Sequence, residues 1–222
     1  MNATLPFSAA QFLAVLAAYN EAWGPVVPTL LTLALAVVAC SLWPRRGSDA
    51  FVAGVLAVLW LWSGLVYHLG FFMAINPASG AFAVIFIAGA VSFVVSGIVR
   101  RQLIFRWRRD LRSALAALLI AYALVAYPLA AVLSGHVYPA LPTFGLPCPT
   151  TLFTIGVLSL LQRPHPWGVL LAPIAWSLVG AQAAFRFAMW PDLALIPSTA
   201  LAIWLATTAG GRPGGEEVAS AA

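Results

Sequence analysis

Charged residues are scarce in this chain. Only 8% of its 222 residues are charged, whereas 63% are hydrophobic and the mean hydropathy is +0.97. A soluble domain carries charges on about a quarter of its residues, because its surface must be solvated. The composition therefore excludes a soluble protein and predicts an all-α integral membrane protein.

Lysine is absent, so all eleven basic residues are arginines. A retinal Schiff base needs a lysine, and its absence excludes that class of membrane protein. The two cysteines, Cys40 and Cys148, form no C-x-x-C motif, which disfavours dithiol exchange. No G-x-S-x-G, H-E-x-x-H or glycine-rich phosphate motif stands in an appropriate context, and the sequence therefore favours a protein that is not an enzyme.

Seven apolar runs are long enough, or nearly so, to cross about 30 Å of hydrocarbon. We expect about seven transmembrane helices in a single membrane domain of residues 1–208. A disordered tail is expected at 209–222, which lacks apolar periodicity. The expected spans are 26–43, 51–73, 82–99, 111–133, 149–161, 169–185 and 193–208.

The arginines are distributed unevenly between alternate loops. Ten of the eleven fall on one side, and Arg186 alone falls on the other. By the positive-inside rule the ten face the cytoplasm, which puts the amino terminus outside and the carboxyl terminus inside. The net charge of +5 thus reports topology and does not indicate nucleic-acid binding. Six arginines lie between Arg100 and Arg112, and we expect this segment to contact anionic lipid headgroups, as a loop or as a basic amphipathic segment on the membrane.

The amino-terminal residues are apolar but do not resemble a signal peptide, because no basic residue precedes Arg45. Ser8 and Gln11 fit a capping box that opens a helix. A helix at 8–20 is too short to span, so we expect an interfacial helix on the outer face and a proline bend at 25–28 into the first span. A mobile terminus is the alternative.

Polar residues without a topological role collect on the predicted outer side. We expect a binding site among them, although each also has a structural interpretation. The structural interpretation of His68 is that its side-chain ring reaches to the membrane interface. The structural interpretation of Arg186 is an ion pair with Asp192 or Glu21. The candidate binding residues are Glu21, His68, Asn76, His136, Tyr138, Cys148, Thr150, Thr151 and Arg186.

The stretch TFGLPCPTT, residues 143–151, leads into the shortest span. A helix over 149–161 rises only about 20 Å, roughly 10 Å short of the far boundary. The preceding residues must therefore descend as non-helical backbone, which is tolerated at that depth only inside protein or beside a wet cavity. We predict a re-entrant outer loop at 134–148 that covers a cavity among the spans.

The chemistry of this stretch has two interpretations. Pro149 suits the first helical position, which makes Cys148 the N-cap of the helix. The helix dipole then favours a thiolate, whereas burial opposes it. Alternatively, the helix end binds an anion with help from the hydroxyl groups of Thr150 and Thr151.

The motif H-x-Y-P at 136–139, followed by TFGLPCPTT, resembles the signature region of an uncharacterised family of bacterial multi-pass membrane proteins. The resemblance extends over most of the chain and includes Y-H at 67–68 and N-P at 76–77. It implies a bacterial cytoplasmic (inner) membrane location and nothing more specific than a permease-like label.

Three functions remain open at this point. A permease-like protein would move a small solute or ion through a site under the 134–148 loop. A metal-binding or thiol-dependent enzyme would use Cys148, His68 and His136, which suit zinc or copper. A non-catalytic assembly or sensor protein would use the loop as a rigid cap. No acidic residue lies in the middle of a span, which disfavours a proton-driven pump.

Overall fold

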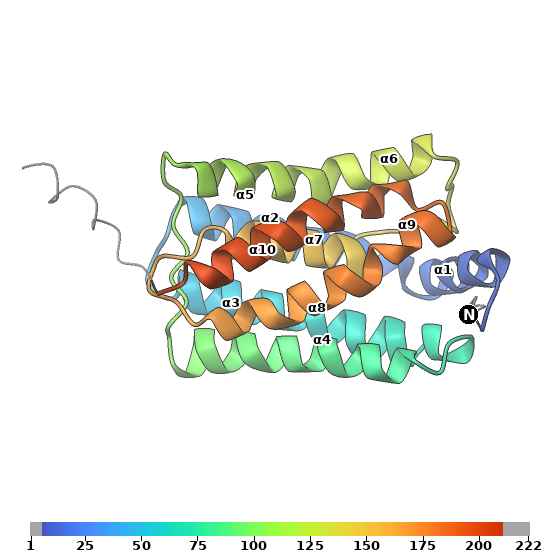
Figure 1. Cartoon of the computed structure of the whole chain (residues 1–222), viewed down its shortest axis with the longest axis horizontal. Helices are drawn as coiled ribbons and strands as arrows, with labels where there is room; N and C mark the ends of the chain where they lie inside the picture. Colours follow the sequence, from blue (N-terminus) through green and yellow to red (C-terminus); the bar gives the residue numbers. More distant parts are fainter. Residues whose placement is uncertain (1–5, 211–222) are drawn as a thin grey trace, which may run out of the picture.

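The computed structural model describes residues 6–210, which fold into a bundle of helices (Figure 1). Within this range there is no β-strand, and two isolated β-bridges are present. The α-helices are α1 Ala9–Trp23, α2 Val27–Leu42, α3 Ser48–Leu61, α4 Ser79–Phe93, α5 Leu111–Ala121, α6 Tyr127–Leu133, α7 Pro147–Leu158, α8 Leu171–Gly180, α9 Gln182–Arg186 and α10 Leu195–Thr207. The π-helical stretches are η2 Trp62–Leu69, η4 Val94–Val99 and η5 Tyr122–Ala126, and the 3-10 turns are η1 Gly24–Val26, η3 Phe72–Ala74, η6 Trp167–Leu170 and η7 Trp190–Ala194.

Each of the seven predicted apolar runs forms a helix, so the all-helical class is confirmed. Five continuous helices are long and apolar enough to cross a membrane. They are Ala9–Leu42, Ser48–Ala74, Ser79–Val99, Leu111–Leu133 and Trp167–Arg186. Helix α7 is apolar but shorter, and α10 has 13 residues. The number of spans therefore stays a prediction.

The two ends of the bundle differ in composition. We call the end that carries the segment 100–110 the arginine end, and the end that carries residues 134–146 and helix α1 the loop end (Figure 1).

The capping box of Ser8 and Gln11 is confirmed, since each side chain bonds the backbone of the other. Helix α1 does not stop at residue 20 but continues through η1 into α2.

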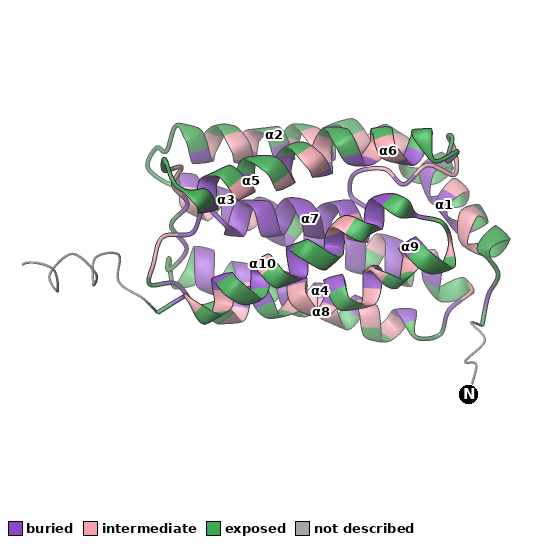
Figure 2. Ribbon diagram, turned by 45° about the horizontal axis from the view of Figure 1, so that its top comes forward, coloured by how far each residue is buried: buried purple, intermediate pink, exposed green. Residues whose placement is uncertain are grey.

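Helix α7 forms the centre of the bundle. Every residue of α7 except Cys148 is buried, and Figure 2 shows it surrounded by the other helices. A helix without a polar face belongs either in a protein core or in lipid, and here the surrounding helices cover it. The helix ends at Leu158 and not at residue 161, because residues 160–162 leave it to pair with the segment 104–106.

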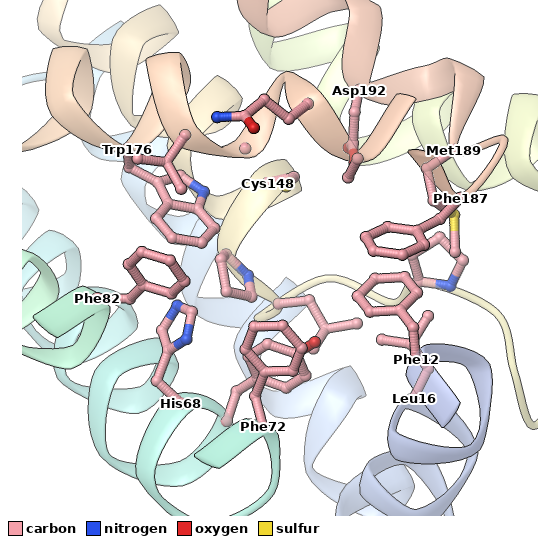
Figure 3. A pocket seen from close by; sticks show the side chains of 18 of the residues that line it. Phe12, Leu16, His68, Phe72, Phe82, Cys148, Trp176, Phe187, Met189 and Asp192 are labelled. Atoms are coloured by element: carbon pink, nitrogen blue, oxygen red, sulfur yellow. The ribbon is translucent and has the colours of Figure 1, made fainter. Parts of the chain in front are cut away.

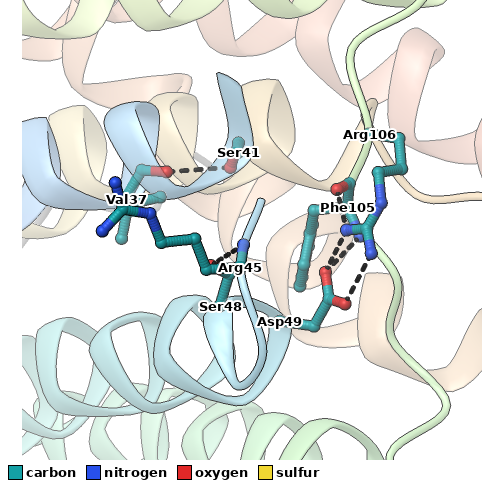
Figure 4. A network of polar contacts seen from close by, with 7 residues as sticks. All are labelled: Val37, Ser41, Arg45, Ser48, Asp49, Phe105 and Arg106. Atoms are coloured by element: carbon teal, nitrogen blue, oxygen red, sulfur yellow. Dashed lines mark hydrogen bonds and ion pairs between the residues drawn. The ribbon is translucent and has the colours of Figure 1, made fainter. Parts of the chain in front are cut away.

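The segment 100–110 runs extended across the arginine end. The backbone N–H groups of Arg106 and Gln162 donate to Leu160 O (3.0 Å) and Ile104 O (2.9 Å). Phe105 is only 1% exposed, and Asp49 accepts from its N–H at 2.9 Å. Asp49 also forms an ion pair with Arg106 at 2.7 Å (Figure 4). The segment is thus anchored to the bundle and does not form an amphipathic helix.

Most of the predicted tail, 211–222, lies outside the described residues. Residues 209 and 210, the first two of the predicted tail, lie in a turn, and Ala209 is 4% exposed. The carbonyl of Ala209 accepts the N–H of His165 at 3.2 Å. The expectation of disorder is therefore wrong for residues 209 and 210, because this backbone bond and burial of Ala209 fix them against the bundle.

Candidate functional site

A partly open cavity of about 180 Å³ lies at the loop end, between α1, η2, α8 and the segment that joins α9 to α10 (Figure 3). Its wall is largely aromatic. The rings that form it include Phe7, Phe12, Phe72, Phe82, Trp176 and Phe187. The apolar wall favours a ligand that is itself mainly apolar or that interacts with aromatic faces.

The side of the cavity next to α1 is closed by stacked rings. Phe12 stacks on Phe187 with centroids 4.4 Å apart and an interplanar angle of 13°. Phe7 also stacks on Phe187, at 5.5 Å. Such pairs contribute about 0.5–1.5 kcal/mol beyond their burial. Helix α1 therefore packs against the bundle and forms part of the site.

His68 lies in the π-helical stretch η2 and is fully buried. The prediction that its ring reaches to the interface is wrong, because the ring packs among aromatic side chains and lies 4.9 Å from the Trp176 ring. Its Nδ1 contacts Ser79 Oγ at 3.2 Å, and that hydroxyl donates its one hydrogen to His68 O at 2.8 Å. Nδ1 must then be the donor to Ser79. Nε2 has no hydrogen-bond partner within residues 6–210 and is left as an acceptor on the cavity wall.

Asp192, in η7, is the acidic group of the cavity and is only 2% exposed. Tyr127 Oη donates to its Oδ1 at 2.6 Å. The π-helical stretch η5 precedes Tyr127, and Tyr122 within it donates to Pro191 O at 2.9 Å, which fixes the turn that carries the carboxyl. Burial raises the pKa of Asp192 to about 7, although contacts with Tyr127 and Cys148 partly offset this.

The predicted ion pair of Arg186 is wrong. Among the described residues the ion pair joins Arg106 and Asp49, and Asp192 bonds a tyrosine instead. Arg186 is exposed at the edge of the cavity. The carboxyl of Asp192 turns inward because Tyr127 offers a buried donor that an exposed arginine does not.

Cys148 lines the cavity, but it is not the N-cap of α7 as predicted. The N-cap is Leu146, and Pro147 takes the first helical position, where its fixed φ and missing N–H cost nothing. Cys148 is therefore the second residue of the helix. Its sulfur lies close to the carboxyl of Asp192 and to the indole of Trp176, whose N–H has no hydrogen-bond partner among the described residues.

The loop 134–146 is held by Asn20 of α1, which is fully buried. Its Nδ2 donates to Pro139 O (2.6 Å) and Leu141 O (2.7 Å), and its Oδ1 accepts from Thr143 Oγ1 (2.8 Å). The non-helical backbone of 144–146 is buried inside protein, as the short helix requires. Its depth in a bilayer stays a prediction.

Gly145 gives the loop its close approach to the bundle. Its φ is +97°, and a Cβ atom there would lie 2.4 Å from Leu30 Cδ1. Ser63 of η2 donates to Gly145 O at 2.9 Å. Only glycine fits both the backbone conformation and the space.

The structure brings together some of the predicted site residues. His68, Asn76, Cys148 and Arg186 line the cavity. Asn76 accepts the N–H of Ala78 at 3.1 Å, so it also fixes the turn before α4. These residues come from three separate segments, which the tertiary fold alone places side by side.

Five other predicted residues do not line the cavity. Glu21 is exposed, and Tyr138 is 62% exposed and donates to Asn20 O at 3.3 Å. Thr150 and Thr151 are buried within α7, and Thr151 Oγ1 donates to Pro147 O at 2.8 Å, so its hydroxyl is not available to an anion. His136 is 8% exposed, with Nδ1 unpartnered.

His136 therefore does not share the cavity with His68 and Cys148. In residues 6–210, no group of three or more His, Cys, Asp or Glu side chains is placed to hold a metal ion. Both cysteines are free. The geometry gives no support to the zinc or copper set.

Sequence reasoning missed three important residues: Asn20, Tyr127 and Trp176. Each is a polar or amphipathic side chain in an apolar helix, and each makes or offers a buried hydrogen bond. Buried polar groups require partners, so isolated polar residues in apolar helices were the available signal. The side-chain partners of Asn20 and Tyr127 are 65 to 123 residues away, which spacing alone does not reveal.

Comparison with known proteins gives a family and no function. No curated protein and no solved structure matches the chain. A model of a family of unknown function (DUF6064) matches residues 9–212, which is nearly all of the described chain. The chain therefore belongs to this family of unknown function, DUF6064.

Proposed function

We propose that this protein is a permease-like membrane protein that binds a small organic cation in the aromatic cavity beneath the 134–148 loop. The observation that carries the proposal is the buried carboxyl of Asp192, which faces an aromatic cavity and has no cationic side chain of residues 6–210 as a partner. Aromatic faces and a carboxylate together attract ammonium groups.

The polar groups of the cavity fit a ligand that donates hydrogen bonds. Asp192 Oδ1 already accepts from Tyr127 Oη, and the thiol of Cys148 lies beside the same carboxyl. His68 Nε2 is a second acceptor, without a partner in the described chain. A protonated amine carries N–H donors and positive charge, so it satisfies both acceptors.

The size of the cavity limits the ligand. An apolar cavity of about 150 Å³ holds one benzene molecule. The cavity here has about 180 Å³, which suits a compact ammonium ion or an amine with one small ring. A cation of this kind crosses hydrocarbon poorly, because its charge must leave water, and it therefore needs a carrier.

The proposed orientation is that of the positive-inside rule, with the loop end outside and the arginine end in the cytoplasm of a bacterium. The cavity would then load from outside, past Arg186. Because α7 is buried along its length, passage to the other side requires helices to shift. The π-helical stretches η2 and η5, beside the cavity, are suited to such shifts.

Binding tests the site. In nanodiscs at pH 8, protonated trimethylamine should bind the wild type, whereas the neutral isostere tert-butanol should not. Asp192→Asn should weaken trimethylammonium binding by about 10- to 100-fold, since a charge-assisted hydrogen bond contributes about 1.5–3 kcal/mol. Glu21→Gln removes an exposed acid at the same end and is the matched control. Equal binding to Asp192→Asn and wild type would refute the site.

Transport is tested separately with tetramethylammonium, which has no N–H donor but keeps the positive charge that the carboxyl and the aromatic faces attract, and which cannot lose that charge and leak across lipid. Proteoliposomes with wild type should take it up faster than protein-free vesicles, and Asp192→Asn should abolish the difference. Binding without uptake would reject the permease-like role and leave a sensor or assembly protein that uses the same site.

A further inference from the structure

A second pocket, of about 390 Å³, lies at the arginine end between the segment 106–113 and residues 159–163. It is separate from the cavity at the loop end and shares no residue with it. Five arginines line it, against one acidic residue, Asp110. The arginines are Arg106, Arg108, Arg109, Arg112 and Arg163.

Not all of these charges are available. Asp49 neutralises Arg106 through contacts at 2.7 and 3.1 Å. Asp110 caps α5 and accepts the N–H of Ser113 at 2.9 Å, so one of its oxygens is already used. Four arginines then face one carboxylate, and the pocket keeps a clear excess of positive charge.

Arg112 is the least expected member of the pocket. It is only 9% exposed, and its Nε and Nη2 are buried without a hydrogen-bond partner in the described part of the chain. Its guanidinium lies 5.7 Å from the centre of the Trp204 ring, which covers a face of the group but accepts none of its N–H bonds in their plane. A buried charge without a counter-ion is strongly destabilising.

We propose that this pocket binds a phosphate group, held by Arg112 together with Arg108, Arg109 and Arg163. The planar guanidinium matches two phosphate oxygens at once, so an occupant of this kind satisfies the unpartnered N–H groups and the excess charge. The phosphate belongs either to the headgroup of an anionic phospholipid or to free phosphate. Both have the same chemistry at the point of contact.

The experiment uses the whole protein exchanged into phosphatidylcholine nanodiscs in phosphate-free buffer. Phosphatidylglycerol or inorganic phosphate is then added, and thermal unfolding and binding are measured. Arg112→Met keeps an unbranched apolar stem but removes the guanidinium and its charge. Arg100→Gln removes an exposed arginine of the same segment that does not line the pocket, and it is the matched control.

The phosphate ligand should stabilise the wild type. Arg112→Met should lower the affinity of the protein for that ligand at least about tenfold. Arg100→Gln should change the affinity less than about twofold. Stabilisation by phosphatidylglycerol alone identifies the lipid, and stabilisation by inorganic phosphate as well identifies free phosphate. If neither stabilises the wild type, or if both variants behave alike, the proposal is overturned.

If Arg112→Met does not fold, a second variant still tests the proposal. Arg163→Gln removes a half-buried charge from the opposite wall of the pocket and should reduce the affinity in the same direction. Without phosphate ligand, Arg112→Met should be at least as stable as the wild type, because it removes an uncompensated buried charge. A variant that is less stable in every condition would show that Arg112 has only a packing role.

Discussion

At the loop end a carboxyl, Asp192, is buried against the hydroxyl of Tyr127 in an aromatic wall, whereas at the arginine end a guanidinium, Arg112, is buried beside other arginines. The carboxyl can take up a proton and become neutral, but an arginine stays charged. The two ends therefore need different occupants. The loop end is stable when empty at low pH, and the arginine end needs an anion at every pH.

The largest effect is expected from closing the space at the loop. Gly145→Val places a β-branched side chain at positive φ and against Leu30, which should lower the free energy of unfolding by about 5 kcal/mol. Gly135→Ala is the control, since Gly135 also has positive φ (+89°) but has no atom within 4 Å of a Cβ. It should cost about 1 kcal/mol by thermal unfolding. Similar losses in the two variants would show that the loop does not pack on Leu30.

The next effect depends on pH. Because the pKa of Asp192 is raised from 3.8 to about 7 in the folded state, the folded protein holds its proton more tightly than the unfolded chain. The contribution of Asp192 to stability should therefore be present below pH 4 and be lost as pH rises from 4 to 7. Asp192→Asn should lack this loss, so the stability of the variant relative to the wild type should rise by roughly 4 kcal/mol between pH 4 and pH 8.

The control for that prediction is Glu21→Gln, an exposed carboxyl at the same end. Four other titratable groups interact with Asp192 or its neighbours: Tyr67, Tyr122, Tyr127 and Cys148. His68 also lines the cavity, and histidines titrate in this pH range, so the carboxyl is isolated by the difference between the pH profiles of wild type and Asp192→Asn, in which contributions common to both proteins cancel. A pH profile unchanged by Asp192→Asn contradicts the assignment.

A smaller effect is expected where α1 holds the loop. Asn20→Ala leaves the carbonyls of Pro139 and Leu141 without their donor, which should lower the free energy of unfolding by about 2–3 kcal/mol. Hydrogen exchange at 138–146 should rise with it. Gln11→Ala, on the exposed side of α1, removes only a capping contact and should leave this exchange unchanged.

The smallest effect is expected at the arginine end, in the ion pair of Asp49 and Arg106. The two side chains are 28% and 32% exposed, so water screens their attraction. A double-mutant cycle with Asp49→Asn and Arg106→Gln should give a coupling of at most about 1 kcal/mol. A much larger coupling would show that this end buries charge pairs as strongly as the loop end does.

Apolar runs and their spacing predicted where the helices lie, because a chain with 8% charge must place its hydrophobic residues in long continuous segments. The short run that became α7 was recognised, and its length correctly required buried non-helical backbone before it. The exact cap was not recognised, since Pro147 and Pro149 both suit a first turn and only the path of residues 144–146 selects Pro147.

The site was predicted in part. His68, Cys148, Asn76 and Arg186 were selected because they are polar and lie near the same end, and they do line one cavity. His136 was selected by the same reasoning and lies elsewhere, because proximity to one end of a bundle does not specify which way a loop side chain points. Asn20 and Tyr127 were missed, because their partners lie more than 60 residues away.

The sequence by itself determined a helical protein with membrane-length apolar segments and an uneven distribution of arginine, because composition and hydrophobic length act locally along the chain. Only the tertiary structure decided that Asp192 turns to Tyr127 and not to Arg186, and that Arg112 is buried. The physical reason is that burial and pairing of polar groups depend on which distant segments meet. Those meetings are set by packing around α7, and no short stretch of sequence encodes them.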